Sequence, residues 1–350
     1  MVLPRLRGRA ARPVVLGMLS LGILGMALWA LGSGAMGISA RAVAAALANG
    51  ALGQPLTGDA AVVWLLRLPR VLLALLVGAA LGGGGAAMQG VFRNPLADPG
   101  LIGVSAGAAL GAVGMIVLGS AVAAVLPWAT GALGVALAAF AGGLLATWLV
   151  YRMGARHGGV ATLLLAGVAI NAMAMAGVGL MTYLANDQQL RSLTFWSLGS
   201  LGGATWSRLA VAAPLIVLPL ALLPRSARAL NALLLGEREA ALLGYRPERL
   251  KAWLIALVAL AVSAAVAMSG VIGFVGLVVP HLLRMVWGPD HRLLLPASAL
   301  GGALLLLVAD TLARTVVVPA ELPIGVLTAL VGGPFFLWLL LRTRALAGLS

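Results

Sequence analysis

The 350-residue sequence contains no cysteine. This absence excludes disulfides, thiolate metal sites and cysteine nucleophiles at once. Charged residues are also scarce, at 9% of the chain, whereas a soluble domain carries about 25%. With 62% hydrophobic residues, the chain has more apolar sequence than a soluble core can absorb. The composition therefore points to a membrane protein.

Acidic residues are especially rare, with nine Asp and Glu against 23 Lys and Arg. Gradient-driven carriers keep ionisable residues at mid-membrane. Here only Asp310 falls inside an expected span, near its outer end and four residues before Arg314. That spacing favours a local helix pair over a proton relay. An ion-gradient-driven secondary carrier is therefore the less favoured alternative.

The sequence also lacks the motifs of enzymes. No G-x-x-x-x-G-K-[ST] phosphate loop occurs, and Lys251 is the only lysine. No H-E-x-x-H motif or aspartate-rich cluster is present, so an integral membrane enzyme acting on lipid is also disfavoured. We expect no catalytic residues, no resident metal and no cofactor. Any transport must then draw its energy from another chain.

Long apolar runs recur along the whole length, and the mean hydropathy is +1.09. A helix needs about 20 mostly apolar residues to cross a bilayer. Glycines 270, 273 and 276 interrupt one of the runs. Ten membrane helices are predicted, at 13–35, 62–90, 100–122, 128–150, 161–184, 207–224, 252–269, 271–287, 295–313 and 322–341.

The distribution of basic residues tests this count. With both termini inside, six of the 23 basic residues fall outside and the other 17 inside; the outer set is Arg41, Arg67, Arg70, Arg191, Arg208 and Arg314. Cytoplasmic loops carry such an excess of basic residues. The net charge of +14 is thus explained by topology, and nucleic acid is not an expected partner. The sequence predicts cytoplasmic termini.

Two features stand out between the spans. Glycines recur every fourth residue at 103, 107 and 111 and at 78 and 82, a spacing that lets membrane helices approach closely. The longest polar stretch inside the chain, 225–251, carries leucines on either side of Gly236. It predicts two short amphipathic helices joined at that glycine.

Several segments, in order along the chain, resemble the FecCD-type permeases, which import iron-siderophores, haem and vitamin B12. Each segment alone is modestly specific, but their order makes a chance resemblance very unlikely. The segments are RLPR at 67–70, NPLADPG at 94–100 running into GVSAG at 103–107, FWSLGS at 195–200 in the outer loop after the fifth span, GFVGLVVPHLLR at 273–284, DTLAR at 310–314, ELPIG at 321–325 and GGPF at 332–335.

The resemblance implies an all-α type II ABC importer permease, a single transmembrane domain over 1–350 in the bacterial inner membrane. It further implies inverted repeats of spans 2–5 and 7–10, and a path along the axis of a dimer with a second copy. Two cytoplasmic ABC ATPase subunits and a periplasmic substrate-binding protein are the implied partners, with membrane lipid around them. Iron chelates, haem or siderophore, are the favoured cargo, and vitamin B12 is the alternative.

The resemblance also assigns residues to the two ends of the molecule. Arg67, Arg70 and Arg314 are expected to dock the binding protein, or alternatively to anchor helix ends among lipid phosphates. The 225–251 segment is expected to couple to the ATPase, or alternatively to lie on lipid. Its candidate residues are Leu234, Gly236, Glu237, Glu239, Ala240 and Gly244.

A third group is assigned to the translocation path. Asn171, Met173 and Met175 lie on the fifth span, and methionine suits an adaptable wall. Buried packing is the alternative explanation for them. The three histidines lie away from the outer half of the path, so metal ligation by the permease is not expected.

Overall fold

The computed structural model describes residues 11–34, 36–127, 131–157, 159–317 and 320–347. These residues form helices joined by short loops, with no strand among them. The all-α prediction is confirmed. The elements are α1 (Ala11–Gly32), α2 (Ala40–Ala51), α3 (Asp59–Ala61), the π-helical η1 (Val62–Arg67), α4 (Leu68–Val91), the 3₁₀ turn η2 (Pro99–Ile102), α5 (Val104–Val125), α6 (Gly131–His157), α7 (Val160–Leu184), α8 (Asp187–Leu198), α9 (Trp206–Leu222), the 3₁₀ turn η4 (Leu223–Ser226), α10 (Ala227–Leu233), α11 (Glu237–Leu242), α12 (Pro247–Ser269), α13 (Val275–Trp287), α14 (His291–Thr315) and α15 (Ile324–Ala347).

Eight helical segments of the described chain are long and apolar enough to cross a membrane. They correspond to predicted spans 1–7 and 9. The tenth predicted span corresponds to α15. The eighth, predicted at 271–287, is shorter than expected, because the chain stays non-helical until α13 begins at Val275. Thirteen residues of α-helix rise about 20 Å, less than the ~30 Å hydrocarbon thickness.

Two membrane helices begin after a break in the backbone. Gly103 precedes α5 with a φ of 87°, and Phe274 precedes α13 with a φ of 66°. Positive φ is unusual for a residue with a Cβ, so Phe274 is held in a strained conformation by its surroundings. Spans 3 and 8 correspond to each other in the expected inverted repeat. Both helices begin directly after a residue with positive φ, which agrees with that expectation.

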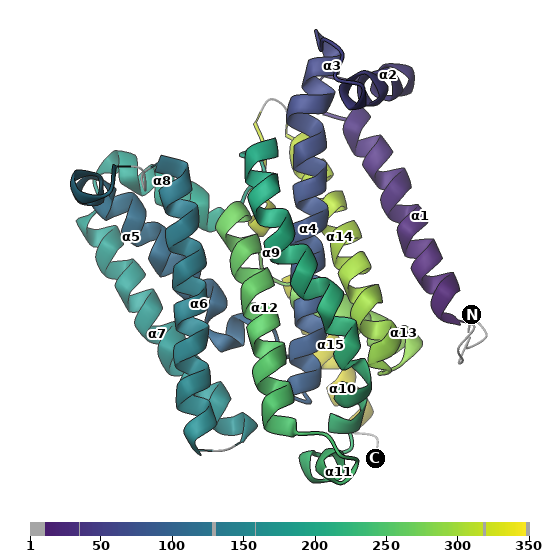
Figure 1. The fold of residues 1–350 in the computed structure, drawn as a ribbon, viewed down its shortest axis with the longest axis vertical. Coiled ribbons are helices and arrows are strands. Elements are labelled where there is room, and N and C mark those ends of the chain that lie inside the picture. The colour runs from purple at the N-terminus through teal and green to yellow at the C-terminus, as the bar shows by residue number, and fades with distance from the viewer. Residues whose placement is uncertain (1–10, 35, 128–130, 158, 318–319, 348–350) are drawn as a thin grey trace.

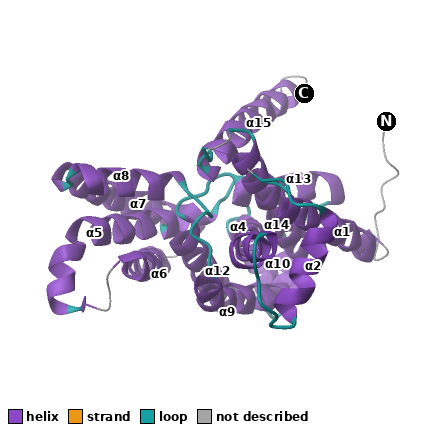
Figure 2. Ribbon diagram, turned by 90° about the horizontal axis from the view of Figure 1, so that it is seen from above, coloured by secondary structure: helices purple, strands orange, loops and turns teal. Residues whose placement is uncertain are grey.

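The middle of the molecule is built on α4, which packs against α12, α13 and α14 (Figure 2). Small residues make this contact possible. A Cβ added to Gly78 would overlap the backbone of Gly302, and one added to Gly82 would overlap the carbonyl of Ser298. The predicted glycine stripe on α4 is therefore an interface where two helix backbones touch.

A second group of helices, α5 to α8, stands beside the first (Figure 1). Here the other predicted stripe has the same role, since Cβ atoms on Gly107 and Gly111 would overlap the backbone of α6 at Gly142 and Ala138. The two groups meet mainly where α12 packs on α6.

The helices arrange the candidate sites at opposite ends. Figure 1 places α2, α3 and α8 at the upper end and α10 and α11 at the lower end. The first turn of α1 lies at the α10 end, because Arg12 pairs with Asp290, which also accepts a hydrogen bond from Asn231 of α10. Burial alone would raise the pKa of Asp290, but these groups and the Arg292 backbone N–H lower it below its ordinary value.

Gly82→Leu should destabilise the molecule strongly, because a side chain there forces α4 and α14 apart. A matched control is Gly114→Leu in α5, where an added Cβ meets nothing within 4 Å. Thermal unfolding in detergent should show a large drop for the first variant and little change for the second. Equal melting temperatures would contradict the close contact.

Candidate functional site

The end of the molecule where α1 ends and α4 begins, which the sequence predicts to face outward, carries a cluster of charged residues from three elements. Arg70 of α4 contacts two carboxylates: its Nε lies 2.9 Å from Asp310 Oδ1, and its Nη2 lies 2.9 Å from Glu321 Oε2. Arg314 lies one helical turn beyond Asp310, with Nε 3.3 Å from Oδ2. The expected helix pair between Asp310 and Arg314 is thus present. The main partner of Asp310, however, is Arg70, which is 240 positions away in the sequence.

Arg67 and Arg314 are not exposed, contrary to the expectation for free docking groups. Each side chain is about 7% exposed. Arg67 donates to the carbonyls of Leu31 and Met36, and Arg314 donates to those of Ala30 and Ser33. The last carbonyls of a helix have no partner within it, so the two guanidinium groups satisfy and hold the end of α1.

Because of this burial, reversing the charge of Arg67 or Arg314 would not be a test of docking. Glutamate at position 67 or 314 would place a carboxylate against backbone carbonyls inside the protein, which is a folding defect. Only Arg70 has an ion-pair partner that reaches the surface, since the Glu321 side chain is 46% exposed. Of the three predicted docking residues, Arg70 is the one a partner can reach by displacing a single side chain.

The candidate coupling element, at the opposite end of the molecule, has the predicted form. Helices α10 and α11 are joined through Gly236, whose φ of 136° favours glycine. Glu237 pairs with Lys251 of α12 at 2.9 Å, which fixes α11 to the next membrane helix. Ala240 is fully buried. Gly244 ends the element with a φ of 86°.

The side chains that α11 presents to its surroundings belong to leucines of the predicted coupling segment that were not singled out as candidates. Leu242 is 88% exposed and Leu243 is 61% exposed, and Leu235 before α11 is exposed as well. Of the predicted coupling residues, Leu234 and Glu237 are half-buried, and Glu239 has an exposed side chain. The predicted residues mostly shape the element, and the leucines form its surface. In the sequence these leucines do not differ from Leu230 and Leu233 of the same segment, which are buried.

The three path residues do not form one surface. Asn171 donates to the Gly100 carbonyl at 3.0 Å and so ties α7 to the η2 turn. Met173 and Met175 are both exposed on α7, but two residues along a helix differ by about 200° in direction. Neither methionine is buried within the single chain. Their place on the path stays a prediction.

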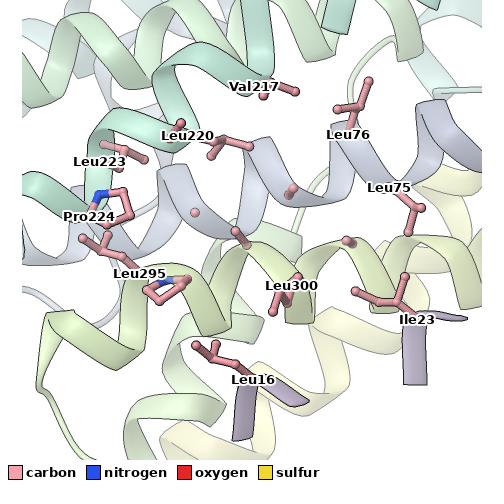
Figure 3. A pocket seen from close by; sticks show the side chains of 16 residues that line it. Leu16, Ile23, Leu75, Leu76, Val217, Leu220, Leu223, Pro224, Leu295 and Leu300 are labelled. Carbon is pink, nitrogen blue, oxygen red and sulfur yellow. The ribbon is translucent and has the colours of Figure 1, made fainter. Parts of the chain in front are cut away.

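Two grooves of similar volume lie elsewhere in the described chain, and one of them, of about 610 Å³, is lined in part by the polar side chains of Gln189, Ser192 and Arg208. The other, of about 530 Å³, lies between α1, α4, α9 and α14 and is lined by apolar side chains such as Leu75, Leu220 and Leu300 (Figure 3). Within the described residues, no three His, Asp or Glu side chains gather into a possible metal site.

Comparisons with known proteins agree with this architecture. Residues 13–342 match the FecCD transport family. Over 284 residues the chain is 55% identical to the hemin transport system permease protein HmuU of Yersinia pestis, covering 81% of this chain and 84% of that one. It is 45% identical over 283 residues to the vitamin B12 import system permease protein BtuC of Escherichia coli O9:H4 (strain HS), with coverages of 81% and 84%.

A solved structure has the same fold. It is described as an inward-facing conformation of an ABC transporter of metal-chelate type, and it superposes with a TM-score of 0.82 at 33% identity, over 94% of this chain and 99% of that one. The predicted family, the all-α fold class and the membrane location are confirmed, whereas the count of ten membrane helices and the cytoplasmic termini stay predictions. The chain therefore belongs to the FecCD transport family, and it is a multi-pass permease of the ABC importer class in the bacterial inner membrane.

Proposed function

We propose that this permease imports a metal chelate, with haem as the first candidate. The observation that carries the proposal is the 55% identity to a hemin permease, against 45% for a vitamin B12 permease over a similar length. The metal-chelate type of the solved relative supports the same class. Cobalamin, itself a bulky metal chelate, is the second candidate because of the 45% identity to its permease.

The path for such a cargo runs between two copies of the chain. The exposed face of α7 carries large apolar side chains, among them Leu165, Met173 and Tyr183. A wall of this kind contacts a flat, bulky chelate without holding it tightly, and Met173 adapts to its shape. Cargo selection is then left to the periplasmic substrate-binding protein.

Energy comes from a separate ATPase subunit that docks on α10 and α11. The exposed leucines of α11 match the way a short amphipathic helix enters a groove of its partner. The Glu237–Lys251 ion pair and the fully buried Ala240 join α11 to the membrane helices. Movement of the ATPase would therefore reach α12 directly. Two ATPase subunits would serve the two permease copies.

An ion gradient is a poor alternative energy source for this chain. Asp310, the carboxylate inside a predicted span, is fully buried and bonded to Arg70 and Arg314. Arginine side chains keep their protons in proteins, so neither of these guanidinium groups can pass a proton to or from Asp310. The chain itself is therefore expected to contribute neither proton coupling nor hydrolysis.

The cargo can be identified by competition in one assay. Proteoliposomes with the permease, its ATPase and its binding protein would be offered hemin, a ferric siderophore and cyanocobalamin at equal concentration. We expect hemin uptake to exceed that of the other two by about tenfold, a difference of 1.4 kcal/mol in apparent binding. A preference for cyanocobalamin would replace haem with the second candidate.

A further inference from the structure

The guanidinium of Arg70 is shared between two carboxylates of different character. On one side, Nε donates to both oxygens of Asp310, at 2.9 and 3.2 Å. On the other side, Nη1 and Nη2 each donate to one oxygen of Glu321, both at 2.9 Å. The second contact is a bidentate pair, the geometry in which arginine binds carboxylates most specifically.

The two carboxylates differ in how easily they can separate from the Arg70 guanidinium. Asp310 is fully buried and is also contacted by Arg314, so separating it from Arg70 would leave a charge without a partner inside the protein. The Glu321 side chain is 46% exposed, and Arg70 is its one ion-pair partner among the described residues. Water can take the place of Arg70 around Glu321, so this contact can break at little cost.

Glu321 lies in the short segment that connects α14 to α15. It lies just before α15, where the chain is tied down by two backbone hydrogen bonds, Leu322 N–H to Ala313 and Ile324 N–H to Gly199. The Arg70 contact adds a tether from this segment to α4. Anything that takes Arg70 from Glu321 therefore loosens the outer start of α15.

We propose that Glu321 is an internal stand-in for a carboxylate of the docking partner. A carboxylate on an acidic surface of the substrate-binding protein displaces Glu321 from Arg70. The buried Asp310 remains bound to the Arg70 guanidinium during this exchange. Docking thus exchanges one carboxylate for another and releases the start of α15. This inference rests on the proposed importer function. It identifies Glu321 as the group that occupies the docking site before the partner binds.

The exchange predicts that Glu321→Gln improves docking. Binding of the substrate-binding protein encoded with the permease would be measured on nanodisc-held permease at low salt. We expect the variant to bind about three- to tenfold more tightly, because the competing surface ion pair is weakened. Asp187→Asn is the matched control, an exposed outer-end carboxylate with no ion pair among the described residues, and it should bind like the wild type.

The possible results of this binding experiment distinguish the importer function of the permease from the stand-in role of Glu321. If the wild type binds no substrate-binding protein at all, the importer function falls and this inference falls with it. If the wild type binds but Glu321→Gln binds equally or more weakly, only the stand-in role is overturned.

A second measurement needs no partner. Arginine-directed modification by phenylglyoxal, read by mass spectrometry, should label Arg70 faster in Glu321→Gln than in the wild type, while the exposed Arg191 should be labelled equally in both. Adding the binding protein should protect Arg70 in the variant. Unchanged Arg70 labelling would overturn the proposal. Protection by phosphatidylglycerol in the nanodisc, but not by the binding protein, would assign the arginine to lipid and also overturn it.

Discussion

Replacing Asp310 with asparagine is expected to lower stability more than any other single polar change in this protein. The carboxylate is fully buried and contacts the guanidinium groups of Arg70 and Arg314. Asparagine would leave two cations close together without a buried counter-charge. Removing one partner from a buried ion pair costs about 3–5 kcal/mol.

The effect can be measured by thermal unfolding in detergent, where we expect the melting temperature to fall by roughly 6–12 °C. Glu321→Gln is the comparison, because it removes a carboxylate from the same guanidinium at the surface, where an ion pair contributes at most about 1 kcal/mol. Similar melting temperatures for the two variants would contradict the buried role of Asp310.

Converting Leu242 and Leu243 to aspartate is expected to separate the ATPase from the permease. Both side chains project from the end of α11, so the change should not affect folding. A buried anchor at an interface contributes about 2 kcal/mol or more, which is a factor of about 30 in affinity for each residue. Co-purification of the ATPase and transport-coupled hydrolysis should both be lost.

The matched control is Arg228→Gln, an exposed residue of α10 at the same end of the molecule. It should leave ATPase association unchanged. A second variant, Gly244→Val, tests the shape of the element: a φ of 86° strains any residue with a β-branched side chain, so coupling should weaken although no exposed leucine is removed. Full ATPase binding by the leucine variant would show that α11 lies on lipid instead.

The sequence was sufficient for features that depend on local pattern. The apolar runs predicted the membrane helices, and Gly236 between two leucine-rich segments predicted the α10–α11 pair, because helix ends and glycine breaks are encoded locally. The helix α8 was missed, and residues 195–198 were assigned to a loop. Its signal was Asn186 and Gln189, whose side chains each bond to the other's backbone in a capping box.

Contacts between residues that lie far apart in the chain could not be predicted from the sequence. Charge and position predicted that Arg67 and Arg314 lie at the outer end, but not that they face inward. Their acceptors are backbone carbonyls 31 to 36 positions away for Arg67 and 281 to 284 positions away for Arg314. Every residue has a carbonyl, so no side-chain pattern marks such a site.

Reconstitution of the permease with its partners can show whether it imports its cargo with energy from a separate ATPase. Proteoliposomes containing the permease and the ATPase would receive the loaded binding protein on the periplasmic side and ATP on the other, with no ion gradient. We predict uptake that requires ATP, the ATPase and the binding protein together. Uptake driven by a proton or sodium gradient in the absence of the ATPase would contradict the account.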